Sequence, residues 1–201
     1  MSMDAKSLLH YAGAPLHPAG LDQAAVVLID CQMEYVSGTL PLTGIQEALI
    51  QAGALLTLAR RHAAPVFHIV HHGRSGGALF DPEGPFVAIA PAVAPIDGEA
   101  VVRKSLPSAF AGTDLDRLIA ATGRRELILA GFMTHMCVST TARAALHLGY
   151  RNTIVASATA TRDLPDPLGG VVPAAVIQRS SLAALADRFA VVVPDTLSLI
   201  G

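Results

Sequence analysis

The stretch ELILAGFMTHMCVSTTARAALHLGY, residues 126–150, begins with a short apolar run and continues directly into a helical pattern. An apolar run of this length, bounded by glycine, is typical of a buried strand, and the spacing after it is typical of a helix. Cys137 stands where the strand gives way to the helix. A thiol at the first turn of a helix lies in an electrostatic environment that favours the thiolate. The stretch therefore predicts a strand–helix unit with a reactive cysteine at its junction.

The same unit recurs along the chain. Helices are expected over 44–63, 113–123 and within 171–189, and Thr113 is the expected N-cap of the second. Further apolar strands are expected at 24–30, 65–72, 100–104, 152–157 and 190–193. Strands that are apolar throughout and alternate with helices form parallel sheets covered on both faces. We expect one α/β domain over residues 1–201, a three-layer α/β/α Rossmann-like fold with a mainly parallel sheet of about six strands. Residues 1–20 are expected to form a peripheral N-terminal arm.

The composition of the chain indicates which kinds of partner and which cellular compartment are expected. The chain has 201 residues, two cysteines and a formal net charge of -2, and its basic residues are scattered. The start lacks a basic patch leading into an apolar signal segment, and no apolar run approaches the roughly 18 residues of a membrane span. We therefore expect a cytoplasmic protein that binds neither nucleic acid nor membrane.

Charged residues make up only 15% of the chain, against roughly 25% in an average soluble domain. Such a low fraction is expected where another subunit covers part of the surface, which favours a homo-oligomer, a dimer or a tetramer. An alanine-rich genome would give the same statistics without an interface.

Three residues with chemical potential stand at the ends of predicted strands, where open α/β sheets bind ligands. Asp30 closes one strand, Lys104 closes another, and Cys137 follows a third. Lys104 is notable because the only other lysine is Lys6, in the expected arm. Burial readily shifts the pKa of an ammonium group, whereas a guanidinium stays protonated. A nucleophile, an acid–base group and a cation are thus predicted at one edge of the sheet. Cys31 should point to the opposite face from Asp30 and serve in packing.

These residues lie in three segments, VVLIDCQMEYVSG, VRKSLPSAFAGTDLDRLI and GFMTHMCVSTTARAALHLGY, which resemble the isochorismatase-like cysteine hydrolases over roughly residues 21–195. That family includes nicotinamidases and N-carbamoylsarcosine amidases. The resemblance implies a catalytic triad of Asp30, Lys104 and Cys137. It also implies a cis peptide between Phe132 and Met133, and an oxyanion hole formed by the N–H groups of Met133 and Cys137.

The resemblance further implies that the Cys137 thiolate attacks an amide or ureido carbon of a small molecule and that a thioester is then hydrolysed by water activated by Asp30. True isochorismatases act on a vinyl ether and do not need the cysteine, so Cys137 favours amide or ureido substrates. No cofactor is expected. Substrate specificity is expected in the 31–43, 73–99 and 159–170 segments. Candidates for the substrate pocket are Gln32, Tyr35, His71, His72, Phe86 and His135.

Other functions fit parts of the pattern. Cys137 and Arg143 have the Cys-x5-Arg spacing of cysteine phosphatases, but the intervening VSTTA lacks glycine and Arg143 should project from the helix. His68, His71 and His72 could hold a metal, yet no acid adjoins them and strand alternation separates His71 from the other two, so no metal is predicted. A catalytically silent oligomeric scaffold is the remaining alternative.

Overall fold

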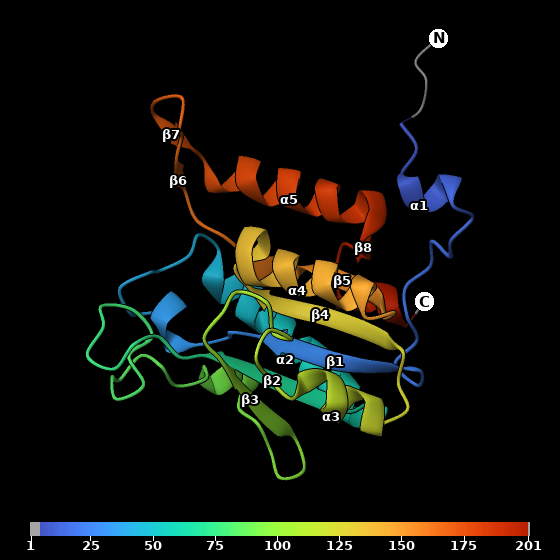
Figure 1. Cartoon of the computed structure of the whole chain (residues 1–201), viewed down its shortest axis with the longest axis horizontal. Coiled ribbons are helices and arrows are strands. Elements are labelled where there is room, and N and C mark those ends of the chain that lie inside the picture. The colour runs from blue at the N-terminus through green and yellow to red at the C-terminus, as the bar shows by residue number, and fades with distance from the viewer. Residues whose placement is uncertain (1–4, 201) are drawn as a thin grey trace.

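Six parallel strands form the centre of the protein, in a computed structural model that describes residues 5–200 (Figure 1). Their spatial order is β3 (Ala100–Lys104), β2 (Val66–His71), β1 (Ala24–Ile29), β4 (Glu126–Phe132), β5 (Arg151–Ala160) and β8 (Val191–Val193). Every neighbouring pair in this sheet is parallel. The predicted fold class is therefore confirmed, and strands that are distant in sequence end at the same edge.

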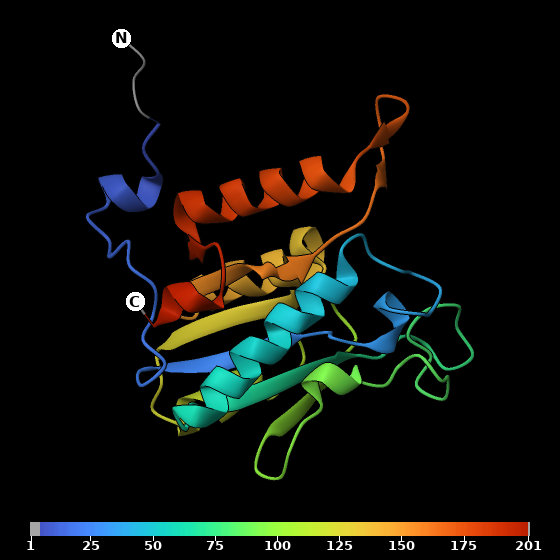
Figure 2. The same cartoon turned by 180° about the vertical axis from the view of Figure 1, so that it is seen from behind.

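Helices cover both faces of this sheet. One long helix, α2 (Ile45–Arg61), runs across one face of the sheet. Figure 2 shows the molecule with this face toward the viewer. The opposite face carries α3 (Leu115–Ala121), α4 (Ser139–His147) and α5 (Ala174–Arg188). A hydrophobic core lies on each face of the sheet, and alternate residues of β1 pack into one or the other. Val26 packs into the core on the α2 side and Val27 into the core on the opposite side. This double burial explains why β1 is apolar throughout.

The amino-terminal arm packs against the edge of the molecule away from the strand ends. A single turn, α1 (Leu8–Tyr11), lies beside α5, where the Leu8 N–H donates to Asp187 at 2.8 Å. Further on, the Ala19 N–H donates to the Thr153 hydroxyl at 2.9 Å. The first four positions of the expected 1–20 arm lie outside the described residues. Within residues 5–200, no helix is long and apolar enough to cross a membrane.

Three local features differ from the sequence-based expectations. Helix α3 has Asp114 at its N-cap rather than Thr113, whose hydroxyl donates to the Ala109 carbonyl at 2.6 Å. Strand β5 continues to Ala160 instead of ending at residue 157. The 159–170 segment, for which no strand was expected, enters an antiparallel hairpin of β6 (Leu164–Pro165) and β7 (Val171–Val172), which projects from the body in Figures 1 and 2.

Short helical turns complete the carboxyl edge of the sheet and the end of the chain. They are η1 (Met33–Tyr35), η2 (Pro91–Val93), the π-helical turn η3 (Thr134–Val138) and η4 (Thr196–Leu199). The η3 turn directly follows β4 and passes into α4. Cys137 therefore lies in a π-helical turn before the helix, and not in the first turn of α4 as expected. π-Turns of this kind are found frequently at functional sites.

Candidate active site

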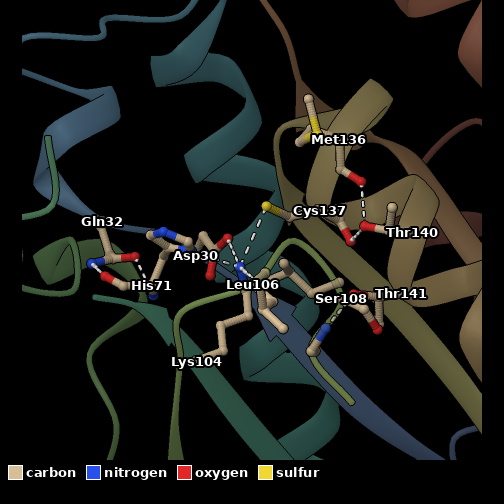
Figure 3. A network of polar contacts seen from close by, with 12 residues as sticks. Asp30, Gln32, His71, Lys104, Leu106, Ser108, Met136, Cys137, Thr140 and Thr141 are labelled. Atoms are coloured by element: carbon tan, nitrogen blue, oxygen red, sulfur yellow. Dashed lines mark hydrogen bonds and ion pairs between the residues drawn. The ribbon is translucent and has the colours of Figure 1, made fainter. Parts of the chain in front are cut away.

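Three strands bring Asp30, Lys104 and Cys137 together at the carboxyl edge of the sheet. Asp30 follows β1, Lys104 is the last residue of β3, and Cys137 lies in η3 after β4. The Lys104 Nζ is 2.8 Å from Asp30 Oδ2 and 3.4 Å from the Cys137 sulfur, as Figure 3 shows. The ammonium thus bridges a carboxylate and a thiol, and the three predicted residues form one cluster.

This cluster is almost completely withdrawn from solvent. Asp30, Lys104 and Cys137 are 0%, 3% and 5% exposed. Neither carboxylate oxygen of Asp30 has a hydrogen-bond partner among the described residues, so the ion pair alone compensates its charge. A buried charge with so little compensation is expensive. Such an arrangement costs stability and is expected where a fold keeps a group for its chemistry.

A neutral histidine holds the ammonium in place. Lys104 Nζ lies 3.1 Å from His71 Nδ1 and donates to the Leu106 carbonyl at 3.1 Å. Burial, and then the charge of Lys104, lower the pKa of His71 to about 4. Because an ammonium can only donate, Nδ1 must be the acceptor and the ring proton must sit on Nε2. His71, a predicted pocket residue, therefore orients the lysine.

Protonation of the thiol differs from the expectation. Burial, followed by the nearby charge of Asp30, raises the pKa of Cys137 to about 12, although Lys104 acts in the opposite direction. Burial likewise raises the pKa of Asp30 to about 6, against the lowering effect of Lys104. The expected low thiol pKa is thus wrong for the resting protein: near neutral pH it holds a thiol beside a carboxylate. Desolvation outweighs the favourable charge of the ammonium.

The backbone between β4 and α4 is fixed closely. Gly131 has φ of 115°, and a side chain there would overlap the Ile29 carbonyl oxygen, so only glycine lets β4 approach β1 at this point. The peptide bond between Phe132 and Met133 is cis, as the family resemblance implies. The Met133 carbonyl accepts the N–H groups of Met136 and Val138. These contacts set the position of the turn that carries Cys137.

Two predicted pocket residues are buried beside the cluster, with different roles. The Gln32 amide donates to the carbonyls of His71 and Val87 and accepts the His71 N–H, all at 3.0 Å or less. With its amide occupied by the main chain, Gln32 is a clamp between β2 and the 73–99 segment, and a substrate contact by this residue stays a prediction. The Tyr35 ring packs edge-on against Phe80. Burial and then the charges of Asp30 and Cys137 raise the pKa of its hydroxyl.

The other three pocket candidates lie farther out. His135 binds the Thr161 hydroxyl at 2.6 Å, which ties η3 to the end of β5. Phe86 is half-buried and lines a cavity of about 160 Å³ together with Glu34. His72 is half-buried, and its pKa is lowered by burial and by Arg103 rather than by any member of the cluster. Of the six candidates, only His71 forms a hydrogen bond with a cluster side chain in the described part of the chain.

The three neighbouring histidines do not converge. His68 binds Glu99 at 2.8 Å, and Glu99 in turn pairs with Arg60 of α2 at 2.8 Å. His71 faces Lys104 instead. Within residues 5–200, no group of three or more histidine, cysteine or acidic side chains is arranged to hold a metal ion. These histidines, which are close in sequence, thus take part in two separate contacts: His68 binds Glu99 and His71 binds Lys104.

Sequence reasoning missed two contributors to the site. The Leu106 carbonyl accepts from Lys104, and the Thr161 hydroxyl contacts His135. A main-chain acceptor carries no signature in the side-chain pattern, and Thr161 was included only within the 159–170 segment. Asp30, Lys104 and Cys137 do not line the cavity that Phe86 and Glu34 share.

A parallel sheet with a cysteine, a lysine and an aspartate gathered beyond its strand ends defines the class of α/β enzymes that place their chemistry at that edge. Within this class, the chain belongs to the isochorismatase family. The family model, an isochorismatase domain, matches residues 24–194.

Individual relatives agree with this assignment over most of the chain. The crystal structure of an isochorismatase from Pseudomonas putida is 41% identical, covers 94% of this chain and 97% of its own, and has a TM-score of 0.90. A secreted isochorismatase effector of Verticillium dahliae is 34% identical over 90% of this chain and 93% of its own length. A maleamate amidohydrolase of Pseudomonas putida is 34% identical over 65% of this chain and 69% of its own length.

Proposed function

We propose that the protein is a cysteine hydrolase that cleaves the C–N bond of a small amide or carbamoyl compound through a thioester. One observation carries the proposal: a buried ammonium touches both a carboxylate and a thiol, at 2.8 and 3.4 Å. This set supplies a nucleophile, a base for its proton and a charge that stabilises both anions. A relative named as an amidohydrolase supports the choice of an amide bond.

In the first half-reaction, Asp30 accepts the proton of the Cys137 thiol while the sulfur attacks the carbonyl carbon. The C–S bond forms as the C=O electron pair moves to oxygen, and the main-chain N–H groups of Met133 and Cys137 bind this oxyanion. Its collapse breaks the C–N bond, and the proton on Asp30 passes to the leaving nitrogen, so ammonia or an amine departs. An Asp30 pKa of about 6 suits a group that gains and loses a proton near neutral pH.

In the second half-reaction, Asp30 takes a proton from water, and the resulting hydroxide adds to the thioester carbon. The same two N–H groups bind the second oxyanion. Breaking the C–S bond releases the carboxylic acid, and the sulfur regains the proton from Asp30. Lys104 remains protonated throughout and offsets the negative charge as it moves between sulfur and carboxylate.

The position of Arg143 argues against a phosphatase. Its guanidinium lies over the Phe189 ring, 4.1 Å from the centroid, and its Nε donates to the Ser139 hydroxyl at 3.3 Å. The residue projects from α4 onto α5 and does not form a loop around Cys137. A catalytically silent scaffold remains the competing function, and activity separates the two.

The test is ammonia release from a panel of primary amides, carbamoyl compounds and nicotinamide, with mass spectrometry for an acyl group on Cys137. Cys137→Ala should lower turnover at least about 10³-fold with the thermal midpoint little changed, and Asp30→Asn should lower turnover as much in a protein that still folds. Cys31→Ala is the matched control, because Cys31 is buried in the α2 core and should retain most activity. Appreciable turnover by Cys137→Ala would refute the mechanism. A parallel assay with a chelator tests whether the activity depends on a metal ion.

We also propose a homo-oligomer. Leu168, Val171 and Val176, on the β6–β7 hairpin and α5, are 95%, 62% and 51% exposed, which favours a partner over this part of the surface. Light scattering should give the mass of a dimer or tetramer, and a monomeric mass would contradict the proposal.

We propose the cytoplasm as the compartment, since the mechanism needs a free thiol and both cysteines are unpaired. Cell fractionation tests this directly: recovery of the protein mainly outside the cytoplasmic fraction would contradict it.

A further inference from the structure

Glu34 is a buried acid that takes no part in the proposed reaction. It lies in the η1 turn and is 3% exposed. Its carboxylate accepts two main-chain N–H groups, that of Thr39 at 2.6 Å and that of Phe80 at 3.1 Å. Within residues 5–200 it forms no ion pair. A buried carboxylate is costly to desolvate, and here it joins the 31–43 segment to the 73–99 segment.

Phe80 has a backbone conformation that phenylalanine rarely adopts. Its φ is 52°, in the left-handed region. The preceding residues 74–79 are exposed or half-buried, whereas Phe80 is 7% exposed. Its N–H donates to Glu34, and its carbonyl accepts the Gly73 N–H at 2.8 Å. Strained backbone of this kind persists only where surrounding contacts hold it, and it is typical of functional sites.

The Phe80 ring packs against the histidine that orients Lys104. The ring centroids of Phe80 and His71 are 5.0 Å apart, and the two planes meet at 68°. The Gln32 amide fixes the main chain of His71 on the other side of the peptide groups. His71 Nδ1 in turn lies 3.1 Å from Lys104 Nζ. A continuous series of contacts therefore leads from Glu34 through Phe80 and His71 to the ammonium.

The cover that Phe80 gives His71 bears on the protonation of the histidine. Burial is the main reason that the pKa of His71 is lowered to about 4, followed by the charges of Lys104 and His72. Water admitted to the ring would weaken this effect of burial. A protonated His71 has no acceptor for the ammonium and repels it. Loss of the Phe80 ring would therefore release Lys104 from its position in the cluster.

We infer that Glu34 and Phe80 are positioning residues for the ammonium of the site. The Glu34 carboxylate holds the main chain of Phe80, and the Phe80 ring keeps His71 as the acceptor that orients Lys104. The inference rests on the proposed hydrolase function for what the ammonium does in the reaction. The state of the His71 ring does not depend on turnover, which allows the two to be tested separately.

The first test follows the His71 ring by ¹⁵N NMR from pH 4 to pH 8, with its signal assigned by its loss in His71→Gln. In the wild type the ring should stay neutral, with its proton on Nε2, to below pH 5. Phe80→Ala and Glu34→Ala should raise the midpoint by about one pH unit or more, and Phe80→Leu should raise it less. Leu79→Ala is the matched control, because Leu79 lies on the same segment and is 37% exposed.

The second test measures kcat and KM on the amides and carbamoyl compounds that the wild type hydrolyses. Phe80→Ala and Glu34→Ala should lower kcat about 10- to 100-fold and change KM less than about threefold, because the ammonium is displaced and the substrate is not. Glu34→Gln should retain more of kcat than Glu34→Ala, because its amide oxygen still accepts an N–H.

The outcomes separate this inference from the hydrolase proposal. If no substrate is hydrolysed but both alanine variants raise the His71 midpoint, the hydrolase proposal fails and the positioning role stands. An unchanged midpoint in both variants, with each folded by circular dichroism, overturns the inference. A rise in KM without a fall in kcat also overturns it, since Phe80 would then act as a wall of the substrate pocket. If the alanine variants do not fold, Phe80→Leu and Glu34→Gln decide by the same two measurements.

Discussion

Replacing Lys104 by methionine tests how the fold tolerates a buried carboxylate. At 2.8 Å the attraction between the Lys104 ammonium and Asp30 is worth about 6 kcal/mol at an effective dielectric constant near 20. The net loss is smaller, because the ammonium no longer has to be desolvated and Asp30 can take up a proton. We expect Lys104→Met to lower the free energy of unfolding by about 3–5 kcal/mol at pH 8 and to abolish turnover.

The loss should depend on pH in a defined direction. Burial already raises the pKa of Asp30 to about 6, and removing the ammonium raises it further. A carboxylate with a raised folded-state pKa stabilises the fold at low pH, and this contribution disappears as the pH rises through the folded-state pKa. The difference between Lys104→Met and wild type should therefore shrink from pH 8 to pH 5.

Urea unfolding followed by circular dichroism at both pH values measures the effect. Lys104→Met/Asp30→Asn should recover most of the stability at pH 8 and remain inactive, because it removes both charges. Lys6→Met is the matched control, since Lys6 is the other lysine and is exposed. If Lys104→Met unfolds at the wild-type urea concentration at pH 8, or its deficit is the same at pH 5, the electrostatic argument is wrong.

Three further outcomes are expected. Gly131→Ala should destabilise the protein by more than about 3 kcal/mol in urea unfolding, because the new Cβ would overlap the Ile29 carbonyl. Gly149→Ala is the control: this glycine also has a positive φ but has open space around it, so the substitution should cost about 1–2 kcal/mol. Gln32→Leu should cost about 2–3 kcal/mol, because two carbonyls and one N–H lose their partner; an unchanged midpoint would contradict its role as a clamp. In a pH–rate profile, kcat/KM should rise about tenfold per pH unit below pH 6 and level off above it, as Asp30 loses its proton; a profile flat from pH 5 to 7 would exclude Asp30 as the base.

Much of the fold could be read from the sequence because the central strands are buried on both faces. The strand expected at 24–30 is observed at Ala24–Ile29, and the apolar run that opens the 126–150 stretch is observed as the strand Glu126–Phe132. Apolar runs locate such strands, and alternation with helices determines that they are parallel. The end of β5 was missed because it contains polar residues such as Thr159, which binds Gln178 of α5.

The site was predictable in its residues but not in its electrostatics. Asp30, Lys104 and Cys137 were found because strand order brings strand ends to one edge. The thiol pKa depends on how much water the folded chain removes, and the position of Cys137 in the sequence does not give this. The clamp formed by Gln32 could not be predicted for a related reason: the sequence does not show that the carbonyls of His71 and Val87 lie within reach of its amide.

The order of strands across the sheet also bears on biosynthesis. The first member of the cluster is made early, on the first strand, whereas the sulfur arrives after the fourth strand, which pairs directly with the first. A chain still emerging from the ribosome therefore carries Asp30 and Lys104 before the thiol of Cys137 has been made. In the proposed mechanism, catalytic competence can arise only when β4 joins the growing sheet, because the turn that follows β4 carries the thiol.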